Sequence, residues 1–349
     1  MQEISKKTLF SAWSGEYNIY RIPGLVALDD GSIITYCEAR QENNDWSALS
    51  IQARISRDGG QTWGETRTIA KAPNGEPVNN PVMIAGKNGT VHFLWQIAYV
   101  RAFYQVSEDN GETFSAPVEI TDVFNAYRER DGYNWNVFAL GPGHGTMLST
   151  GRLVIPVWVA FGEGRAHAPS FTSAVYSDDN GKTWHAGNII PWDEDCPSMN
   201  ETCIAELSDK SVLFNIRNVS RRLHRASSIS KDGAETFSDY SFEPDLPDPI
   251  CFAGMASGKT EGKHAIVFSN CANSENRARI NLTVRLSFDD GKTWAHSRLL
   301  ENTAGYSDCA ISPSGEWIYC FYEQNKDANY GTEPRHLTFA RMNIDWIKD

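Results

Sequence analysis

One eight-residue turn motif occurs five times in the chain, and this repetition limits the folds that the chain can adopt. The motif reads Ser-x-Asp-x-Gly-x-Thr followed by Trp or Phe, and its copies begin at residues 56, 107, 177, 230 and 287. Repetition at a period of about 50 residues is typical of structures built from stacked or radially arranged units. Because the copies extend from Ser56 to Trp294 without an obvious linker, we expect one radial domain over residues 1–349.

The residues before each motif predict β-strands. Before the last copy, apolar side chains alternate with polar ones from Ile280 to Ser287, which is the pattern of a strand with one buried face. The chain then turns at Asp290-Gly291 and re-enters a strand at Trp294. Repeated units of short strands at this period predict an all-β fold made of β-propeller blades.

Each residue type of the motif has a role in folding. The Asp can accept hydrogen bonds from backbone N–H groups of its own turn, and the Gly permits a positive φ. The aromatic residue is expected to pack the end of the hairpin against the core. Only the fourth copy departs, with Ala234 in place of Gly. The motif therefore predicts architecture and carries no chemistry.

Composition excludes some classes of partner. The formal net charge is −12, which does not suit nucleic acid, whose binding rests on neutralising phosphates with Lys and Arg. No apolar run is long enough to span a membrane. The N-terminus lacks the apolar core of a signal peptide, so we expect an intracellular protein or one whose leader has been removed.

The cysteines and the one Gly-flanked histidine predict no metal site. The seven Cys include no Cys-x-x-Cys pair, and most stand in apolar surroundings, so we expect buried free thiols. His144 lies in a tight Gly141–Gly145 turn with no second ligand at a recognisable spacing, so a structural role is favoured.

Three stretches carry candidate functional residues. Arg21 stands in an apolar run, where its charge needs either a carboxylate partner of the protein or an anionic ligand. Glu201 opens a strand and Arg217 closes the next, so a hairpin would bring them together. The long loop at residues 122–140 is rich in Asn, Arg and aromatic residues, and loops of this length are uncommon unless they are functional.

These features together resemble the exo-α-sialidase (neuraminidase) family. The resemblance rests on Tyr-Arg-Ile-Pro near the start, the five turn motifs, Asn-Glu-x-x-x-x-Glu-Leu followed by Asn-x-Arg, Arg-x-Asn-Leu-Thr-Val, and Gly-Tyr-Ser-Asp. It covers nearly the whole chain, from about Arg21 to Tyr322. The turn motif alone is a weak signal, whereas the ordered combination is specific. The resemblance implies a six-bladed β-propeller with Asp-box turns and a site at its axis.

The resemblance also implies residue roles. Three arginines match the clamp that holds the substrate carboxylate, Tyr306 matches the nucleophile, and Glu201 matches the carboxylate that activates it. Asp45 matches the acid/base, although Glu42 lies in the same loop, and Arg40 matches a pocket arginine near it. The clamp residues are Arg21, Arg217 and Arg279.

The chemistry of a sialic acid explains these residue types. Guanidinium groups bind carboxylates bidentately, which suits a substrate with a carboxylate on its anomeric carbon. That carboxylate would repel a carboxylate nucleophile, whereas a neutral Tyr avoids the repulsion if a Glu takes its proton. Sialidases are an exception of this kind to the two-carboxylate rule of glycosidases. Asp45 would protonate the leaving oxygen, for which we expect the pocket to raise its pKa.

Two positions depart from the family pattern. Asn80 stands before Pro81 where many members have Asp, and Trp46 directly follows the expected acid. Both positions are expected near the ring substituents, so the sugar is either sialic acid or a related 2-keto acid. The related acids considered are deaminated neuraminic acid, 3-deoxy-octulosonic acid and pseudaminic acid.

Three functions fit the sequence. The first is a retaining exo-glycosidase acting on a sialylated or related glycan, without a metal or other cofactor. The second is a trans-sialidase-type transglycosidase, which an acceptor platform made by the aromatic residues of the 122–140 loop would favour. The third is a non-catalytic glycan-binding propeller, in which loss of the Tyr, Glu or Asp would be expected. The sequence does not determine the linkage preference or the oligomeric state.

Overall fold

In the part of the chain that the structure describes, the strands form five sheets, and the ladders between paired strands are antiparallel. The computed structural model describes residues 2–327 and 334–348, and the predicted all-β fold is confirmed within them. The helical segments described are η1 (Thr121–Asn125), α1 (Ala126–Glu129) and α2 (Ile344–Lys348). None of the helices in these residue ranges has the length and apolar character needed to cross a membrane.

Four of the sheets are meanders, in which strands pair antiparallel in chain order, apart from the short β11 of the third sheet. The first contains β2 (Ile19–Ala27), β3 (Ile33–Arg40), β4 (Ala48–Ser56) and β5 (Arg67–Ala70). The second contains β6 (Val78–Ala85), β7 (Val91–Ile97), β8 (Arg101–Ser107) and β9 (Val118–Glu119). The third contains β10 (Val137–Leu140), β12 (Leu153–Ala160), β13 (Ser170–Ser177) and β14 (His185–Ala186), with β11 (Thr146–Met147) also paired to β12. The fourth contains β15 (Thr202–Glu206), β16 (Val212–Ile216), β17 (His224–Ser230) and β18 (Ser241–Pro247).

The last sheet has seven strands because one long strand belongs to two ladders. The first half of β22 (His296–Ile311) pairs with β21 (Ile280–Ser287), and its second half pairs with β23 (Trp317–Asn325). Two groups of four strands therefore share β22. The other members are β19 (Gly254–Thr260), β20 (Lys263–Cys271), β24 (Pro334–Asn343) and β1 (Ile4–Ser11). β24 pairs with β1, which joins the last strand of the chain to the N-terminal one.

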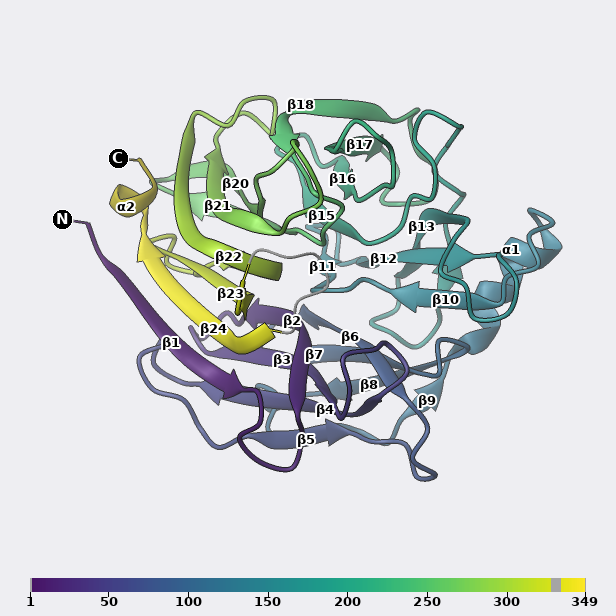
Figure 1. Ribbon diagram of the computed structural model, residues 1–349, viewed down its shortest axis with the longest axis horizontal. Helices are drawn as coiled ribbons and strands as arrows, with labels where there is room; N and C mark the ends of the chain where they lie inside the picture. The colour runs from purple at the N-terminus through teal and green to yellow at the C-terminus, as the bar shows by residue number, and fades with distance from the viewer. Residues whose placement is uncertain (1, 328–333, 349) are drawn as a thin grey trace.

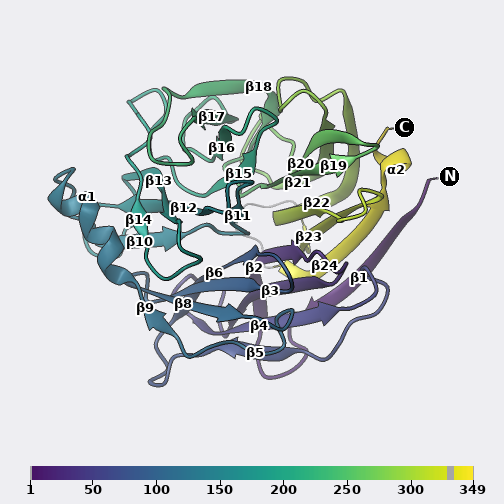
Figure 2. The ribbon, with the colours of Figure 1, turned by 180° about the vertical axis from the view of Figure 1, so that it is seen from behind.

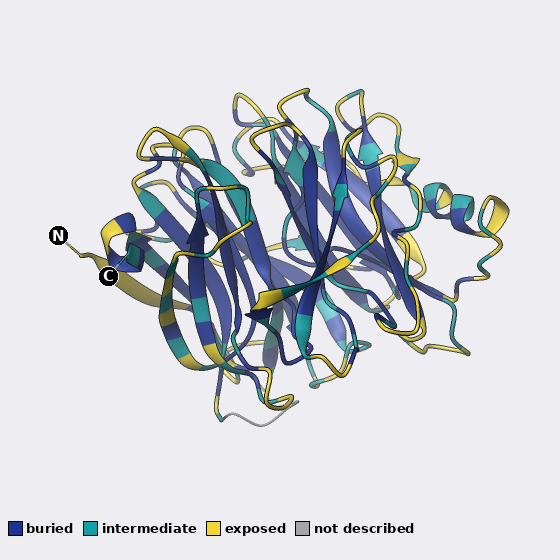
Figure 3. Cartoon of the chain, turned by 90° about the horizontal axis from the view of Figure 1, so that it is seen from above, coloured by how far each residue is buried: buried dark blue, intermediate teal, exposed yellow. Residues whose placement is uncertain are grey.

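The sheets follow one another in chain order around the middle of the molecule (Figures 1 and 2). β2 of the first sheet contacts β22, β23 and β24, so the two ends of the chain lie side by side. Figure 3 shows that the strands are buried along most of their length and that exposed residues gather in the turns. The six-bladed arrangement itself stays a prediction.

The five turn motifs share one hydrogen-bond pattern, which confirms the predicted role of their Asp. In the first copy, Asp58 accepts from the backbone N–H of Thr62 at 2.8 Å and from its hydroxyl at 2.6 Å. The same two bonds recur in the other four copies. Ala234 adopts a φ of 82°, close to the 89° of Gly60, so the fourth turn keeps its shape despite the missing Gly. The aromatic ring of Trp63 packs on Phe339 with 4.9 Å between centroids.

Two further predictions about the interior are confirmed. All seven cysteines are buried and free. Nδ1 of His144 lies 2.8 Å from the carboxylate of Asp308 on β22, so this histidine connects the third sheet to the last. Leu25 also donates its backbone N–H to Asp308, at 3.0 Å, which brings the first sheet to the same carboxylate.

Candidate active site

A pocket of about 540 Å³ lies where the ends of strands and loops from several sheets converge. Eight of the nine residues proposed from the sequence line it, and Arg40 does not. Its lining residues are Arg21, Ile22, Asn43, Asn44, Asp45, Trp46, Asn80, Tyr99, Trp158, His167, Asn200, Glu201, Arg217, Arg279 and Tyr306.

Tyr306 on β22 lies at the base of this pocket and is almost fully buried. Its hydroxyl donates to Oε1 of Glu201 at 2.6 Å and accepts from Nη1 of Arg217 at 2.7 Å. Burial, only partly opposed by the nearby Arg217, raises the pKa of Tyr306 well above its ordinary value. The resting side chain is therefore a neutral phenol whose proton is already directed at a carboxylate.

Three guanidinium groups surround the Tyr306 ring. Their central carbons lie 5.7, 5.8 and 5.1 Å from the ring centroid for Arg21, Arg217 and Arg279, respectively. Arg21 belongs to β2, whereas the other two flank strands in the fourth and last sheets. Residues separated by as many as 258 positions in the sequence thus form one cationic surface, which suits a carboxylate ligand.

The hairpin of β15 and β16 places Glu201 beside Arg217, as the sequence predicted. The backbone N–H of Arg217 donates to the carbonyl of Glu201 at 3.1 Å, and their side chains form an ion pair. The two residues stand immediately outside the ends of the paired strands. The hairpin therefore holds the backbone of each residue in place, while the charged side chain reaches the pocket.

The sequence analysis missed Glu323, a fully buried carboxylate at the end of β23. It accepts from Nε of Arg21 at 2.6 Å and from the backbone N–H groups of Ile22 and Tyr306 at 3.2 and 3.0 Å. Burial would raise its pKa, but Arg21, the backbone N–H of Tyr306 and Arg279 together outweigh burial and lower it. Glu323 directly follows the apolar end of a predicted strand, and a charge in that setting was the available signal, as it was for Arg21.

Arg40 lies behind the pocket wall rather than in it. Its guanidinium is fully buried and donates twice to Oε2 of Glu38, at 2.5 and 2.8 Å, and once to Oδ1 of Asp45, at 3.0 Å. The expectation that it faces the ligand is therefore not met in this structure. The reason is Glu38, whose buried carboxylate on the same strand holds the guanidinium in place.

Asp45 is directed into the pocket from the loop between β3 and β4, and its pKa is lowered. Burial raises the pKa of this carboxyl, but Arg40, Arg21 and His167 together outweigh burial. We expected the pocket to raise this pKa, and the structure shows the opposite for the protein without ligand. The positive groups that favour an anionic substrate also favour the ionised form of Asp45.

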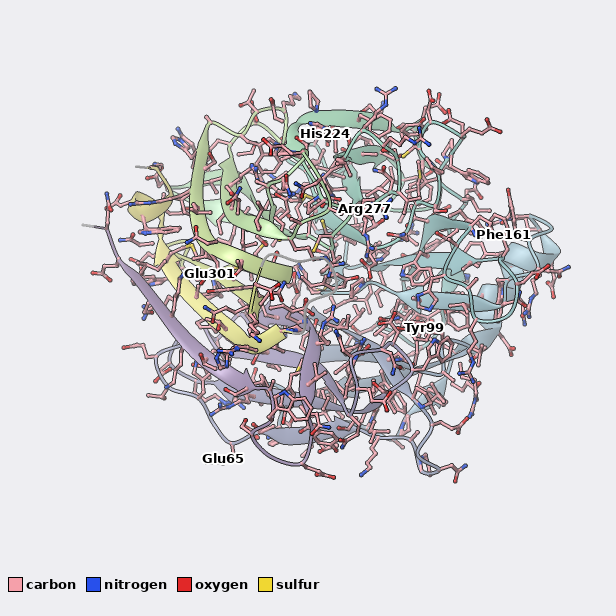
Figure 4. All side chains as sticks on the ribbon, in the orientation of Figure 1. Glu65, Tyr99, Phe161, His224, Arg277 and Glu301 are labelled. Carbon is pink, nitrogen blue, oxygen red and sulfur yellow. The ribbon has the colours of Figure 1, made fainter. Side chains whose placement is uncertain are left out.

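Aromatic rings form the pocket wall next to Asp45. Trp46 lies 5.1 Å from Tyr99, and His167 lies 5.0 Å from Tyr99 and 5.2 Å from Trp158, measured between ring centroids. Ala98 and Tyr99 both adopt positive φ, 52° and 58°, in the turn after β7. Such backbone strain is found at sites where a side chain must be held in one place. Figure 4 shows Tyr99 nearer the middle of the molecule than Phe161, which lies towards α1.

No local pattern in the sequence marks Tyr99, Trp158 or His167, because each stands in an ordinary turn, strand or loop. They become neighbours only through packing of the second and third sheets. Asn80 joins the same side of the pocket with a φ of 47°. Its side-chain amide donates to Gln96 at 3.3 Å, which an Asp at this position could not do.

The aromatic residues of the 122–140 loop do not form an exposed platform. Tyr127 and Trp135 are buried core residues, and the half-buried Tyr133 packs on Phe161 and Phe171 at 5.0 and 4.9 Å. η1 and α1 occupy the first half of this loop. These aromatic residues, which were expected to favour transfer to an acceptor sugar, therefore pack within the protein in this chain.

Comparisons with known proteins identify a family and several relatives of this chain. A family model described as "BNR repeat-like domain" matches residues 27–330. A sialidase of Micromonospora viridifaciens is 27% identical, with 94% of this chain and 52% of that protein covered. A sialidase of Bacteroides fragilis (strain YCH46) is 28% identical, with 94% and 63% covered. The chain thus spans about half to two thirds of the length of these relatives.

A solved structure shares the fold. The Hadza microbial sialidase Hz136 superimposes with a TM-score of 0.79 at 24% sequence identity, over 95% of this chain and 67% of that chain. Agreement over nearly the whole chain indicates the same arrangement of sheets.

Proposed function

The chain belongs to the BNR repeat-like family and resembles its sialidases over most of its length, and from this premise we propose that it is a retaining exo-α-sialidase. It would release terminal α-linked sialic acid from glycoconjugates through a covalent tyrosyl intermediate. The observation that supports this most directly is the Tyr306–Glu201 hydrogen bond of 2.6 Å within a ring of three guanidinium groups.

The proposed architecture is a six-bladed β-propeller formed as one catalytic domain. Four meander sheets supply four blades, and the two groups of strands that share β22 supply two more. Contact between β2 and β22–β24 supports closure of the ring, because a closed ring leaves few sheet edges exposed. Each blade then contributes a strand end to the axial pocket.

In the first step the substrate carboxylate binds to Arg21, Arg217 and Arg279. Oη of Tyr306 attacks the anomeric carbon while Glu201 takes the phenolic proton, so that the nucleophile carries no charge when the anionic substrate approaches. The bond to the leaving oxygen breaks, and Asp45 donates a proton to that oxygen. In the second step water attacks the same carbon, Tyr306 leaves and recovers its proton from Glu201, and Asp45 accepts the proton of the water. Two displacements give retention of configuration.

The lowered pKa of Asp45 is compatible with this role once the substrate is bound. Arg21 is one of the groups that lower this pKa, and the substrate carboxylate neutralises part of its charge. Binding therefore favours the protonated acid. Every step uses side chains of the chain and water.

Trp46, Tyr99, Trp158 and Asn80 are proposed to recognise the substituents on the sugar ring. An uncharged, aromatic wall suits a substituent such as an acylamino group better than a charged one. N-acetylneuraminic acid is therefore the first candidate, and deaminated neuraminic acid, 3-deoxy-octulosonic acid and pseudaminic acid are the related alternatives.

The test is release of 4-methylumbelliferone from its α-ketosides of N-acetylneuraminic acid, deaminated neuraminic acid and 3-deoxy-octulosonic acid. We expect hydrolysis of the first. Hydrolysis of only one of the others would retain the mechanism and assign the selectivity to the wall around Asn80 and Trp46. Absence of hydrolysis for all three, in protein that is folded by circular dichroism, would contradict the proposal of a sialidase.

A further inference from the structure

The two oxygens of the Asp45 carboxylate have different neighbours. Oδ1 accepts a hydrogen bond from Nη1 of Arg40 at 3.0 Å, whereas Oδ2 faces Nδ1 of His167 at 3.8 Å. His167 belongs to the loop between β12 and β13, so the third sheet contributes a titratable group to an acid that the first sheet supplies. Nothing in the sequence placed the two together.

Three aromatic rings form a cage around the His167 ring in the pocket wall. Trp46, Tyr99 and Trp158 lie 6.1, 5.0 and 5.2 Å from it, centroid to centroid. Within the described ranges, its Nε2 atom is buried without a hydrogen-bond partner. Asp45 is therefore the polar group that the imidazole meets. The His167 side chain is 32% exposed and that of Asp45 is 47% exposed, so both have room for the small rotation that would close 3.8 Å to a hydrogen bond.

Asp45 needs a source of protons to act as a general acid, and His167 can supply one. A general acid must carry a proton when the substrate arrives, yet Arg40, Arg21 and His167 all favour the ionised form of Asp45. Imidazole holds a proton at much higher pH than a carboxyl does. Since the proposed hydrolysis consumes one proton at the leaving oxygen and returns one from water, a store next to Asp45 would be refilled in every cycle.

We propose that His167 is a positioning residue that stores the acid proton and passes it to the leaving oxygen through Asp45. This inference rests on the proposed sialidase function. In the resting protein the pair holds one proton, shared between Nδ1 of His167 and Oδ2 of Asp45.

The proton balance of the cycle is closed. As the anomeric C–O bond breaks, the one proton of the pair moves from Nδ1 of His167 to Oδ2 of Asp45 and from there to the leaving oxygen, which leaves a neutral imidazole, protonated on Nε2, and a carboxylate. In the second step the attacking water gives its proton to Asp45, and the pair returns to its one-proton state. The proton that Tyr306 gives to Glu201 moves separately and returns to Tyr306.

The charged groups around the pair set the direction of its pH dependence. Asp45 is faced by Arg40 and Arg21, and His167 is influenced by Asp45, Glu201, Arg217 and Arg40. Burial lowers the pKa of His167 and the two carboxylates oppose burial only in part, so that its pKa is lowered overall. Activity that needs the stored proton should therefore fall as pH rises towards neutrality and above.

The first arm of the test does not depend on activity. The chemical shifts of the His167 ring are followed by NMR against pH in wild type and in Asp45→Asn. If the two side chains share a proton, removing the carboxylate charge lowers the pKa of His167, because the favourable partner of the imidazolium is lost. An unchanged pKa would overturn the proposal even if the protein is an active sialidase.

The second arm compares leaving groups in His167→Phe, which keeps a ring in the aromatic cage. With a natural sialoside as substrate we expect kcat/KM to fall by roughly 10²-fold and its alkaline limb to move to lower pH. The 4-methylumbelliferyl ketoside needs little protonation and should be affected much less. Equal losses on both substrates would show that His167 only shapes the pocket, and would overturn the proposal.

Chemical rescue separates proton storage from packing. In His167→Ala, added imidazole should restore turnover of the natural sialoside, whereas pyrazole, which has the same ring size and is far less basic, should not. Rescue by both would overturn the proposal. The matched control is His264→Asn, which removes another His–Asp contact, 3.4 Å from Asp290, at a turn outside the pocket. It should leave the pH profile unchanged.

Discussion

At the residue scale, the proposed chemistry depends on the phenolic oxygen of Tyr306 and the carboxylate oxygen of Glu201 that accepts its proton. The phenol is neutral because it is buried, and its proton has one carboxylate acceptor at 2.6 Å. Arg217 donates to the same phenolic oxygen at 2.7 Å, where it can stabilise the negative charge that develops as the proton leaves. The proposed nucleophile, its proposed base and one arginine of the proposed clamp are therefore expected to act as a unit, and we expect their substitutions to be non-additive.

Removing the Tyr306 hydroxyl tests this unit. In Tyr306→Phe we expect kcat on the best α-ketoside to fall by roughly 10³-fold or more, because the atom that bonds to the anomeric carbon is absent. The thermal unfolding midpoint should change little, because the ring and its packing on Phe252 remain, at 5.6 Å between centroids. Wild-type activity in this variant would contradict the assignment of the nucleophile.

At the scale of elements, the strand ends carry the residues of the pocket, whereas the repeated turns stabilise the hairpins. Strands β2, β22 and β23 meet at Glu323, whose carboxylate accepts from Arg21, Ile22 and Tyr306. One buried carboxylate thus binds both the Arg21 side chain and the backbone of Tyr306, the proposed nucleophile. The repeated turns contain no pocket residue. They hold the hairpins together through their Asp–Thr bonds, and the Gly residues of four copies lie close to side chains of a neighbouring sheet.

The turn glycines differ in how closely neighbours approach them. A Cβ built on Gly181, which has a φ of +86°, would lie 2.2 Å from the hydroxyl oxygen of Tyr104. On Gly291, with a φ of +79°, the nearest atom would be 3.3 Å away, on Leu213. Ala234 shows that a methyl group fits the same turn where the neighbouring sheet leaves space.

We therefore predict unequal costs for the same substitution in two copies of the motif. Gly181→Ala should lower the free energy of unfolding by about 2–4 kcal/mol, the sum of left-handed strain and overpacking against Tyr104. Gly291→Ala serves as the control and should cost only about 1–2 kcal/mol, chiefly from the strain. Urea unfolding followed by tryptophan fluorescence measures both. A larger loss for Gly291→Ala would contradict the packing argument.

On the scale of the whole molecule, contacts between sheets far apart in sequence hold the pocket in shape. His144 of the third sheet and Leu25 of the first both contact Asp308 of the last. Burial would lower the pKa of His144, but Asp308 outweighs burial and raises it above its ordinary value of 6.5. The protonated histidine is therefore more favourable in the folded protein than in the unfolded chain.

The sign of this linkage gives a pH prediction. A raised pKa contributes stability that is complete below pH 6.5 and is lost as pH rises through the folded-state pKa. The deficit of His144→Asn relative to wild type, measured as the shift in thermal unfolding midpoint, should be larger at pH 5.5 than at pH 9. An equal deficit at both values would mean that the histidine acts without its charge.

Much of the fold and half of the site could be predicted from the sequence, for physical reasons that differ between residues. The turn motifs and alternating strands are local patterns, so they predicted the sheets correctly. Glu201 and Arg217 could be paired because a hairpin fixes the relation of its own ends. Arg40 could not be placed, since its position depends on a buried carboxylate two residues away whose direction no pattern specifies.

The sequence by itself determined the repeated strands, the turns that join them and the residue types of a carboxylate-binding site, because these depend on near neighbours along the chain. Only the tertiary structure decided how residues from different sheets come together in the pocket. It buried Tyr306, placed Glu323 behind Arg21, lowered the pKa of Asp45 and brought His167 to it. Burial and charge depend on distances between sheets, and those distances exist only after the strands have packed.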